Sequence, residues 1–126
     1  MEKKKINIVA KDIDEGVKLV TIEGELDTVT STEADEIISC FIDENKDIIM
    51  DCVNLKYLNS TGLALLLKYH IQMKRRERSL RIIILNKFIS ELLEAAGATK
   101  LLEIYKTQGE AIESLNSERA KRRMPQ

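Results

Sequence analysis

The chain has 126 residues, of which 44% are hydrophobic and 33% charged. This size predicts one domain with an ordinary hydrophobic core. The net charge of −1, from 20 basic and 21 acidic side chains, argues against a general nucleic-acid-binding protein. No apolar run approaches the roughly 20 residues that span a bilayer, and no signal peptide is recognisable. We therefore expect a cytoplasmic protein.

Reactive side chains are scarce. His70 is the only histidine, and Cys40 and Cys52 are eleven residues apart, which is not a metal-binding or redox spacing. We expect His70 to be a partly buried structural residue and both cysteines to pack as small hydrophobic groups. The composition therefore predicts no metal site, and it favours binding or switching over catalysis.

The charge is unevenly distributed. Residues 1–5 carry +2 and residues 117–126 carry +3, which leaves −6 for residues 6–116. The basic segment 117–126 is interpreted either as a soluble, partly disordered tail or as an extension of the last helix. A third interpretation is weak attachment to an acidic partner or surface.

The first predicted elements are two strands. Apolar residues alternate with polar ones over residues 6–10 and again over residues 17–22, a period typical of strands. Asp14-Glu15-Gly16 between them reads as a tight turn, because glycine readily adopts positive φ. The short link predicts an antiparallel hairpin, and the pattern breaks at Gly24-Glu25-Leu26-Asp27.

A helix and a buried strand follow. Apolar residues at 34, 37, 38 and 41 have the i, i+3, i+4, i+7 spacing of an amphipathic helix, with Thr30, Ser31 and Thr32 as candidate N-caps. Residues 47–53 are apolar almost throughout, which suits a central strand covered on both faces. Asp51 is discordant there, and we expect it to accept bonds from nearby backbone amides. Residues 54–58 are predicted to be a connector.

The second half alternates helices and strands. A helix is predicted from Asn59 to about residue 78, and the cations at its end suit the helix dipole. A buried strand over 81–85, a short helix over 89–96 and its C-cap Gly97 follow. Residues 101–105 read as a short strand, and a last helix starts at residue 110. The order β-β-α-β-α-β-α-(β)-α predicts an α/β fold: a mixed, mostly parallel sheet of four to five strands packed by about four helices.

The segment Asn59-Ser60-Thr61-Gly62-Leu63 begins a helix directly after a strand and connector. The first backbone N–H groups of a helix are unpaired and favour anions, so a phosphate on Ser60 would be stabilised there. The alternative is that Ser60 is simply the N-cap. Gly62 has no side chain, and we expect it to leave room for another protein's backbone. No Gly-Lys-Ser/Thr follows, so no ATP-binding loop or other cofactor site is predicted.

Three segments resemble a known family. Gly24-Glu25-Leu26-Asp27, Ile48-Ile49-Met50-Asp51-Cys52 and Tyr57-Leu58-Asn59-Ser60-Thr61-Gly62-Leu63 are similar to the STAS domain of anti-sigma-factor antagonists. The resemblance covers about residues 6–116, so we expect a single STAS domain over residues 1–116.

The resemblance implies a partner switch. The unphosphorylated form would bind an anti-sigma factor that is also a serine kinase, and so free a sigma factor. Phosphorylation at the position of Ser60 would weaken binding, and a phosphatase would reset the domain. Asp27, Asn59, Thr61, Gly62 and Leu63 would share the partner-binding surface with Ser60.

Asn59 departs from the family motif, which normally has aspartate there. It removes one negative charge beside the hydroxyl, so a second hypothesis stays open: a STAS scaffold or adaptor subunit of a stress-signalling or transporter complex, without a phosphate cycle. A small enzyme is the third alternative, although no nucleophile–base pair can be argued.

Overall fold

The computed structural model describes residues 5–123 and begins with the predicted hairpin. Strand β1 (Ile6–Asp14) pairs antiparallel with β2 (Val17–Leu26), with Ile8 opposite Ile22. Gly16 in the turn has φ +74°, a conformation that glycine adopts without steric cost. The antiparallel hairpin is confirmed.

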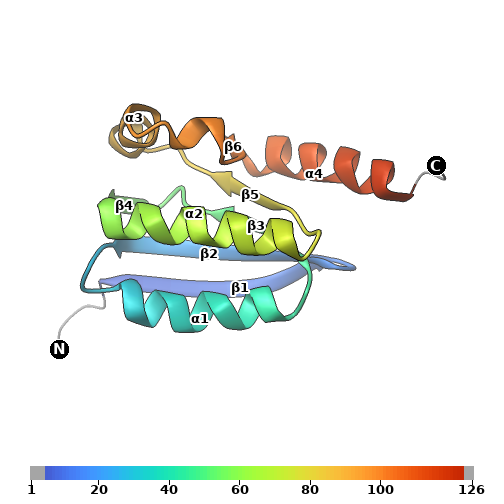
Figure 1. Ribbon diagram of the computed structural model, residues 1–126, viewed down its shortest axis with the longest axis horizontal. Helices are drawn as coiled ribbons and strands as arrows, with labels where there is room; N and C mark the ends of the chain where they lie inside the picture. Colours follow the sequence, from blue (N-terminus) through green and yellow to red (C-terminus); the bar gives the residue numbers. More distant parts are fainter. Residues whose placement is uncertain (1–4, 124–126) are drawn as a thin grey trace.

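The sheet has six strands, one or two more than expected. Its order is β1-β2-β3-β5-β6, and β3 (Asp47–Asp51), β5 (Leu80–Ile83) and β6 (Ile104–Tyr105) run parallel to β2. The α/β class with an antiparallel edge is confirmed (Figure 1).

The additional strand is β4 (Leu55–Leu58), where the prediction of a connector was wrong. β2 is ten residues long and β3 only five, so the end of β2 extends past β3. β4 pairs in parallel with this extension, from Gly24 to Leu26. Leu55 and Leu58 are buried while the two residues between them are exposed, a spacing that lacks the alternation of an ordinary strand.

Helices cover both faces of the sheet unequally. On one face lie α1 (Ser31–Asp43), α2 (Ser60–Arg75) and α3 (Lys87–Ala95), whose buried residues join the main core. Among the helices of residues 5–123, α4 (Gln108–Arg123) alone covers the other face, where it packs on β3, β5 and β6. A short 3-10 turn, Ala98–Lys100, links α3 to β6. Figure 1 shows α1 and α2 side by side in front of the hairpin strands.

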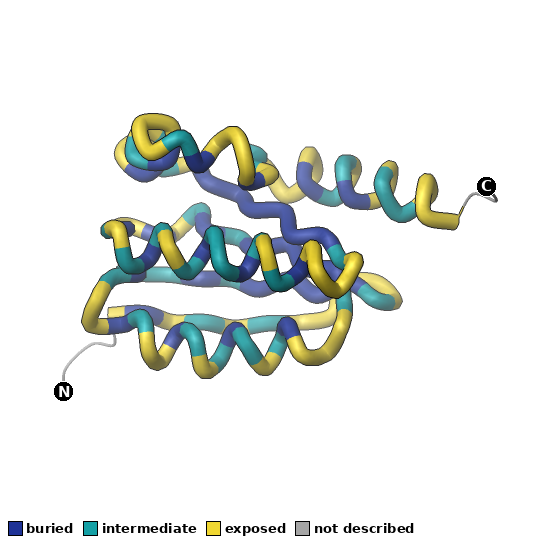
Figure 2. The backbone as a smooth tube through the Cα atoms, in the orientation of Figure 1, coloured by how far each residue is buried: buried dark blue, intermediate teal, exposed yellow. Residues whose placement is uncertain are grey.

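Successive side chains of a strand point to opposite faces of the sheet, so the sheet separates two apolar cores. On β3, Ile48 and Met50 belong to the main core and Ile49 to the smaller one beneath α4. β5 is buried along its whole length (Figure 2), as expected for a central strand of a mostly parallel sheet. The smaller core has six buried members, Val17, Leu19, Ile49, Ile83, Ala111 and Leu115.

The basic C-terminal segment extends α4. The helix continues to Arg123, and Arg119 and Arg122 form ion pairs with Asp47. Residues 117–123 are therefore helical and attached to the sheet rather than disordered, while residues 124–126 of the predicted tail and residues 1–4 lie outside the described residues. No helix between residues 5 and 123 is long and apolar enough to cross a bilayer.

Four single-residue predictions have outcomes here. Asp51 Oδ1 accepts a hydrogen bond from the Val53 backbone amide at 3.0 Å, as expected. Cys52 is fully buried, and burial raises the pKa of its thiol to about 12. Cys40 is exposed, so its prediction as a packed hydrophobic group was wrong. It lies on the outer side of α1, where its thiol donates to the Glu36 carbonyl. His70 is half-buried on α2.

Candidate functional site

The candidate site lies where β2 and β4 end and α2 begins. Leu26 and Leu58 are paired in parallel, so the residues that follow them, Asp27 and Asn59, leave the sheet side by side. The backbone amide of Asn59 donates a hydrogen bond to the Leu26 carbonyl at 3.4 Å. The carboxyl edge of the sheet thus brings together two segments about thirty residues apart, as expected for functional residues in a parallel sheet.

Asn59 is the N-cap of α2. Its Oδ1 accepts a hydrogen bond from the Gly62 amide at 3.1 Å, and its Nδ2 donates to Thr28 Oγ1 at 3.2 Å. An aspartate could make the first bond but has no N–H for the second. Asn59 therefore caps the helix, and the interpretation of Ser60 as the cap is wrong.

Ser60 is the first residue of α2 and is exposed. No residue from 5 to 123 makes a hydrogen bond with its hydroxyl, because Asn59 already provides the cap. The first turn of α2 contains no acidic residue. A group attached to this hydroxyl would therefore lie in the positive field of a sixteen-residue helix.

Asp27 shapes the loop beside Ser60. Its Oδ1 accepts hydrogen bonds from the backbone amides of Val29 at 2.9 Å and Thr30 at 3.0 Å. These bonds, led by the one from the Thr30 amide, hold the pKa of the Asp27 carboxyl below its ordinary value. The carboxylate therefore stabilises the path of the chain from β2 into α1.

Thr61 links the two segments from the α2 side. Its Oγ1 lies 3.1 Å from Thr28 Oγ1, which also accepts from Asn59. Leu63, one turn after Asn59, is half-buried and packs against the main core. Among the six predicted site residues, Ser60 is therefore the exposed one, and the others position it or border it.

Gly62 has a different role from the one predicted. It is buried, and a Cβ there would lie 2.4 Å from the Leu26 carbonyl oxygen and 2.6 Å from Leu58 Cδ1. The expectation that Gly62 leaves room for a partner's backbone was wrong, because β2 and β4 of the same chain fill that space. Glycine allows α2 to lie directly against the end of β2.

Exposed apolar residues occur near the same edge and were missed in the sequence. Val29 follows β2 and is 72% exposed, while Leu85 and Phe88 flank the start of α3 and are 58% and 66% exposed. Tyr57 on β4 is 42% exposed. In Figure 1, α1, α2 and α3 all begin at the same end of the sheet. The sequence could have indicated the exposure of Phe88, because Phe88 is not part of the apolar stripe formed by Ile89 and Leu93, the buried residues of α3.

The described residues provide no metal centre. No group of three or more histidine, cysteine, aspartate or glutamate side chains between residues 5 and 123 could hold a metal ion. The site offers an exposed hydroxyl at a helix N-terminus, at the end of the sheet where exposed apolar side chains also occur. This arrangement suits covalent modification and protein binding.

The chain belongs to the STAS domain family, whose sequence profile matches residues 9–111. It is similar to the anti-sigma-B factor antagonist of Staphylococcus aureus (strain NCTC 8325 / PS 47), with 29% identity over 86 residues, covering 68% of this chain and 80% of that protein.

Solved structures share the fold. An anti-sigma factor antagonist from Mycobacterium paratuberculosis has a TM-score of 0.81 at 20% identity, covering 88% of this chain and 94% of that one. The anti-sigma factor antagonist SpoIIAA in its unphosphorylated form has a TM-score of 0.72 at 17% identity, covering 88% and 97%. The Bacillus cell fate determinant SpoIIAA has also been solved in its phosphorylated form, with a TM-score of 0.65 at 17% identity, covering 86% and 98%.

Proposed function

We propose that this protein is an anti-sigma-factor antagonist controlled by phosphorylation of Ser60. The unphosphorylated form binds an anti-sigma factor with serine kinase activity and so releases a sigma factor; a phosphatase restores it after phosphorylation. The observation that carries the proposal is the exposed Ser60 hydroxyl at the first position of α2, which has no hydrogen-bond partner among residues 5–123. The names of the relatives and the two solved states of SpoIIAA support it.

The electrostatics of the site explain how one phosphate weakens binding. Phosphorylation adds about −1.5 to −2 charges at neutral pH, and the N-terminus of α2 stabilises this charge within the protein. A partner covering Ser60 together with the exposed apolar residues at this edge, such as Val29 and Phe88, would have to desolvate that charge. Since a buried charge without a partner is costly, the phosphorylated form dissociates.

The site residues have distinct roles in this proposal. Ser60 receives the phosphate, and Thr61 and Leu63 border it on α2. Asn59 holds the start of the helix, and Asp27 holds the adjacent loop. Gly62 acts indirectly, because it sets how closely α2 approaches β2. The protein supplies the hydroxyl, and the kinase and phosphatase supply the chemistry.

The test is incubation of the full chain with its cognate kinase and ATP, followed by intact-mass and fragment mass spectrometry. We expect one phosphate on Ser60 and none on Ser60→Ala. Ser117→Ala, which removes an exposed hydroxyl on α4, is the matched control and should be phosphorylated like the original chain. Phosphate on another residue, or none on a chain that binds the kinase, would contradict the proposal.

Asn59 favours a second candidate, a STAS scaffold or adaptor without a phosphate cycle. The side-chain amide of Asn59 donates a hydrogen bond to Thr28, which connects the loop to the helix. The first turn of α2 has no carboxylate beside Ser60. We expect Asn59→Asp to keep the cap and to change the phosphorylation rate, measured with the same kinase. A complex with another STAS protein or a transporter, with no phosphate on Ser60, would instead select the scaffold.

A further inference from the structure

A second surface lies beside the C-terminal half of α2. A hollow of about 460 Å³ is lined by Leu67, His70, Ile71, Lys74, Arg75 and Leu101. Ile71 is 49% exposed and Leu101 is 61% exposed. His70 is ten residues along the helix from Ser60, roughly 15 Å, so this surface is separate from the candidate phosphorylation site. Side chains this apolar and this exposed, gathered in one hollow, are typical of binding surfaces.

The two cations at the hollow, Lys74 and Arg75, have no ion-pair partner in the part of the chain that the structure describes. Neither Lys74 nor Arg75 forms an ion pair with any residue from 5 to 123, whereas the neighbouring Arg76 pairs with Asp43 at 2.9 Å. Cations in the last turn of a helix are ordinarily explained by the helix dipole. That explanation accounts for the charges but not for the apolar floor of the hollow, which is formed by Leu67, Ile71 and Leu101.

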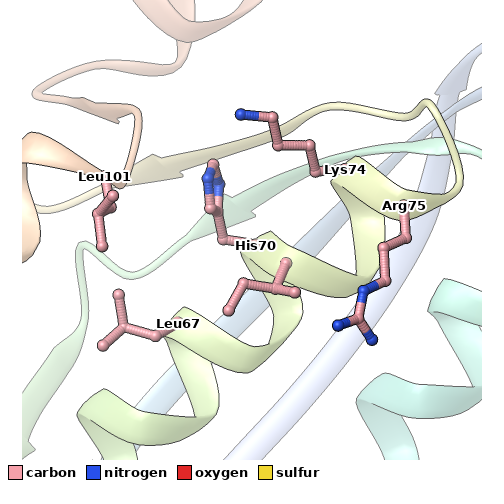
Figure 3. Close-up of a pocket in the computed structure, with 6 residues that line it drawn as sticks. Leu67, His70, Lys74, Arg75 and Leu101 are labelled. Carbon is pink, nitrogen blue, oxygen red and sulfur yellow. The ribbon is translucent and has the colours of Figure 1, made fainter.

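The arrangement of the two cations defines the kind of occupant. Figure 3 shows Leu67 and Leu101 at one end of the hollow, while the Lys74 and Arg75 side chains point to opposite sides of α2. The apolar floor is thus flanked by positive charge on both sides. A helix with an apolar stripe flanked by carboxylates is complementary to it, since peptide helices bind grooves through residues at i, i+3, i+4 and i+7.

We propose that this hollow binds an acidic amphipathic helix of a partner protein. A fatty acid would fill the floor but has one anionic group, which cannot satisfy cations on both sides. A second copy of this chain, seated symmetrically, would bring its own Lys74 and Arg75 against the same charges. The proposal is independent of the phosphorylation of Ser60 and can hold or fail separately from it.

The experiment uses the full, ¹⁵N-labelled chain and a synthetic helical peptide with leucines at i, i+3, i+4 and i+7 and glutamates on both flanks. We expect amide chemical-shift changes over residues 67–75 and at Leu101, and weaker binding at high salt. Ile71→Glu should weaken binding about tenfold or more, equivalent to about 1.4 kcal/mol. Val9→Glu, on the exposed surface of β1, is the matched control and should bind like the original chain.

Two further comparisons decide between occupants. The double variant Lys74→Glu and Arg75→Glu should lose the glutamate peptide and gain a peptide with lysines on its flanks. Equal binding of both peptides by the original chain would overturn the proposal. So would shift changes outside the hollow, saturation of the hollow by dodecanoate but not by the glutamate peptide, or self-association of the chain through these residues.

Discussion

Gly62 controls the position of Ser60 through the contact between α2 and β2. Substituting Gly62 with alanine would place a Cβ 2.4 Å from the Leu26 carbonyl oxygen, a backbone atom that cannot rotate away. We expect Gly62→Ala to lower the free energy of unfolding by about 1–3 kcal/mol or more, as overpacking does. Urea denaturation followed by circular dichroism measures this change.

Gly109 on α4 is the matched control for Gly62. The nearest atom to a Cβ at Gly109 is Thr107 Oγ1 at 3.9 Å, which is ordinary contact. Since alanine favours helices over glycine, Gly109→Ala should change the stability by less than about 1 kcal/mol. Equal losses in the two variants would show that the close approach at Gly62 is not the cause.

At the scale of residues, the sequence predicted that Ser60 lies at the start of a helix but not what surrounds it. Ser60 and the capping capacity of Asn59 are local features, visible in a short motif. The burial of Gly62 depends on β2, more than thirty residues earlier in the chain, so no local pattern could reveal it. The exposure of Val29 and Phe88 likewise depends on which side of each element the core occupies.

At the scale of elements, α4 is held to the sheet by ion pairs as well as by apolar contact. Only Ala111 and Leu115 are buried in it. Arg122 donates to both carboxylate oxygens of Asp47, at 2.9 and 3.1 Å, and Asp47 is buried. Arg122 also donates to the Ser79 hydroxyl. These bonds attach the end of α4 to the start of β3.

Removing this attachment should destabilise the protein. Arg122→Ala leaves the buried Asp47 carboxylate with the Ser79 amide at 2.8 Å and Arg119 at 3.5 Å. We expect a loss of about 1–3 kcal/mol, measured by urea denaturation. Arg123→Ala, one residue further along and exposed without an ion pair among residues 5–123, should stay within about 0.5 kcal/mol of the original chain. Similar effects of the two substitutions would refute the proposed role of Arg122.

β4, which was predicted to be a connector, and the end of α4, for which the sequence left a tail and a helix extension open, have physical reasons in common. Apolar periodicity predicts an element from its own buried face. β4 has only two buried residues, and its strand conformation comes from pairing with the overhanging end of β2. The end of α4 is attached through arginines, which in a sequence look like a solvated tail. The elements with strong apolar patterns, such as β3 and α2, were predicted correctly.

At the scale of the whole molecule, carboxylates connect elements that are distant in sequence. Asp12 on β1 accepts from Lys46 before β3 at 3.1 Å, and Asp35 on α1 accepts from Lys68 and Tyr69 on α2 at 2.9 and 2.8 Å. Glu118 on α4 accepts from Arg81 on β5 at 2.6 Å. The ion pairs with Lys46, Lys68 and Arg81 require the ionised form of each acid, so the assembled fold depends on the charge of these groups.

The pKa values of these groups predict acid sensitivity. Hydrogen bonds from Lys46 and Lys18 lower the pKa of Asp12. Burial alone would raise the pKa of Asp35 and Glu118, but the bonds from Lys68 and Tyr69, and from Ser79 and Arg81, outweigh it and lower both. Because the folded-state pKa lies below the ordinary values of 3.8 for Asp and 4.5 for Glu, their stabilisation is complete above those values. It disappears as the pH falls through the folded-state pKa.

We therefore expect the free energy of unfolding to fall as the pH is lowered below about 4.5, with these carboxylates as the cause. The double variant Asp35→Asn and Glu118→Gln should be less stable at neutral pH and should show a flatter decline, since two of the titrating groups are gone. The measurement is the urea midpoint at a series of pH values. Glu113→Gln, an exposed position on α4 without an ion pair among residues 5–123, should keep the profile of the original chain. If the stability of the double variant declined as steeply with falling pH as that of the original chain, the acid sensitivity would have to come from other groups. The interactions of Asp35 between α1 and α2, and of Glu118 between α4 and β5, would then contribute little to the pH dependence of the assembled fold.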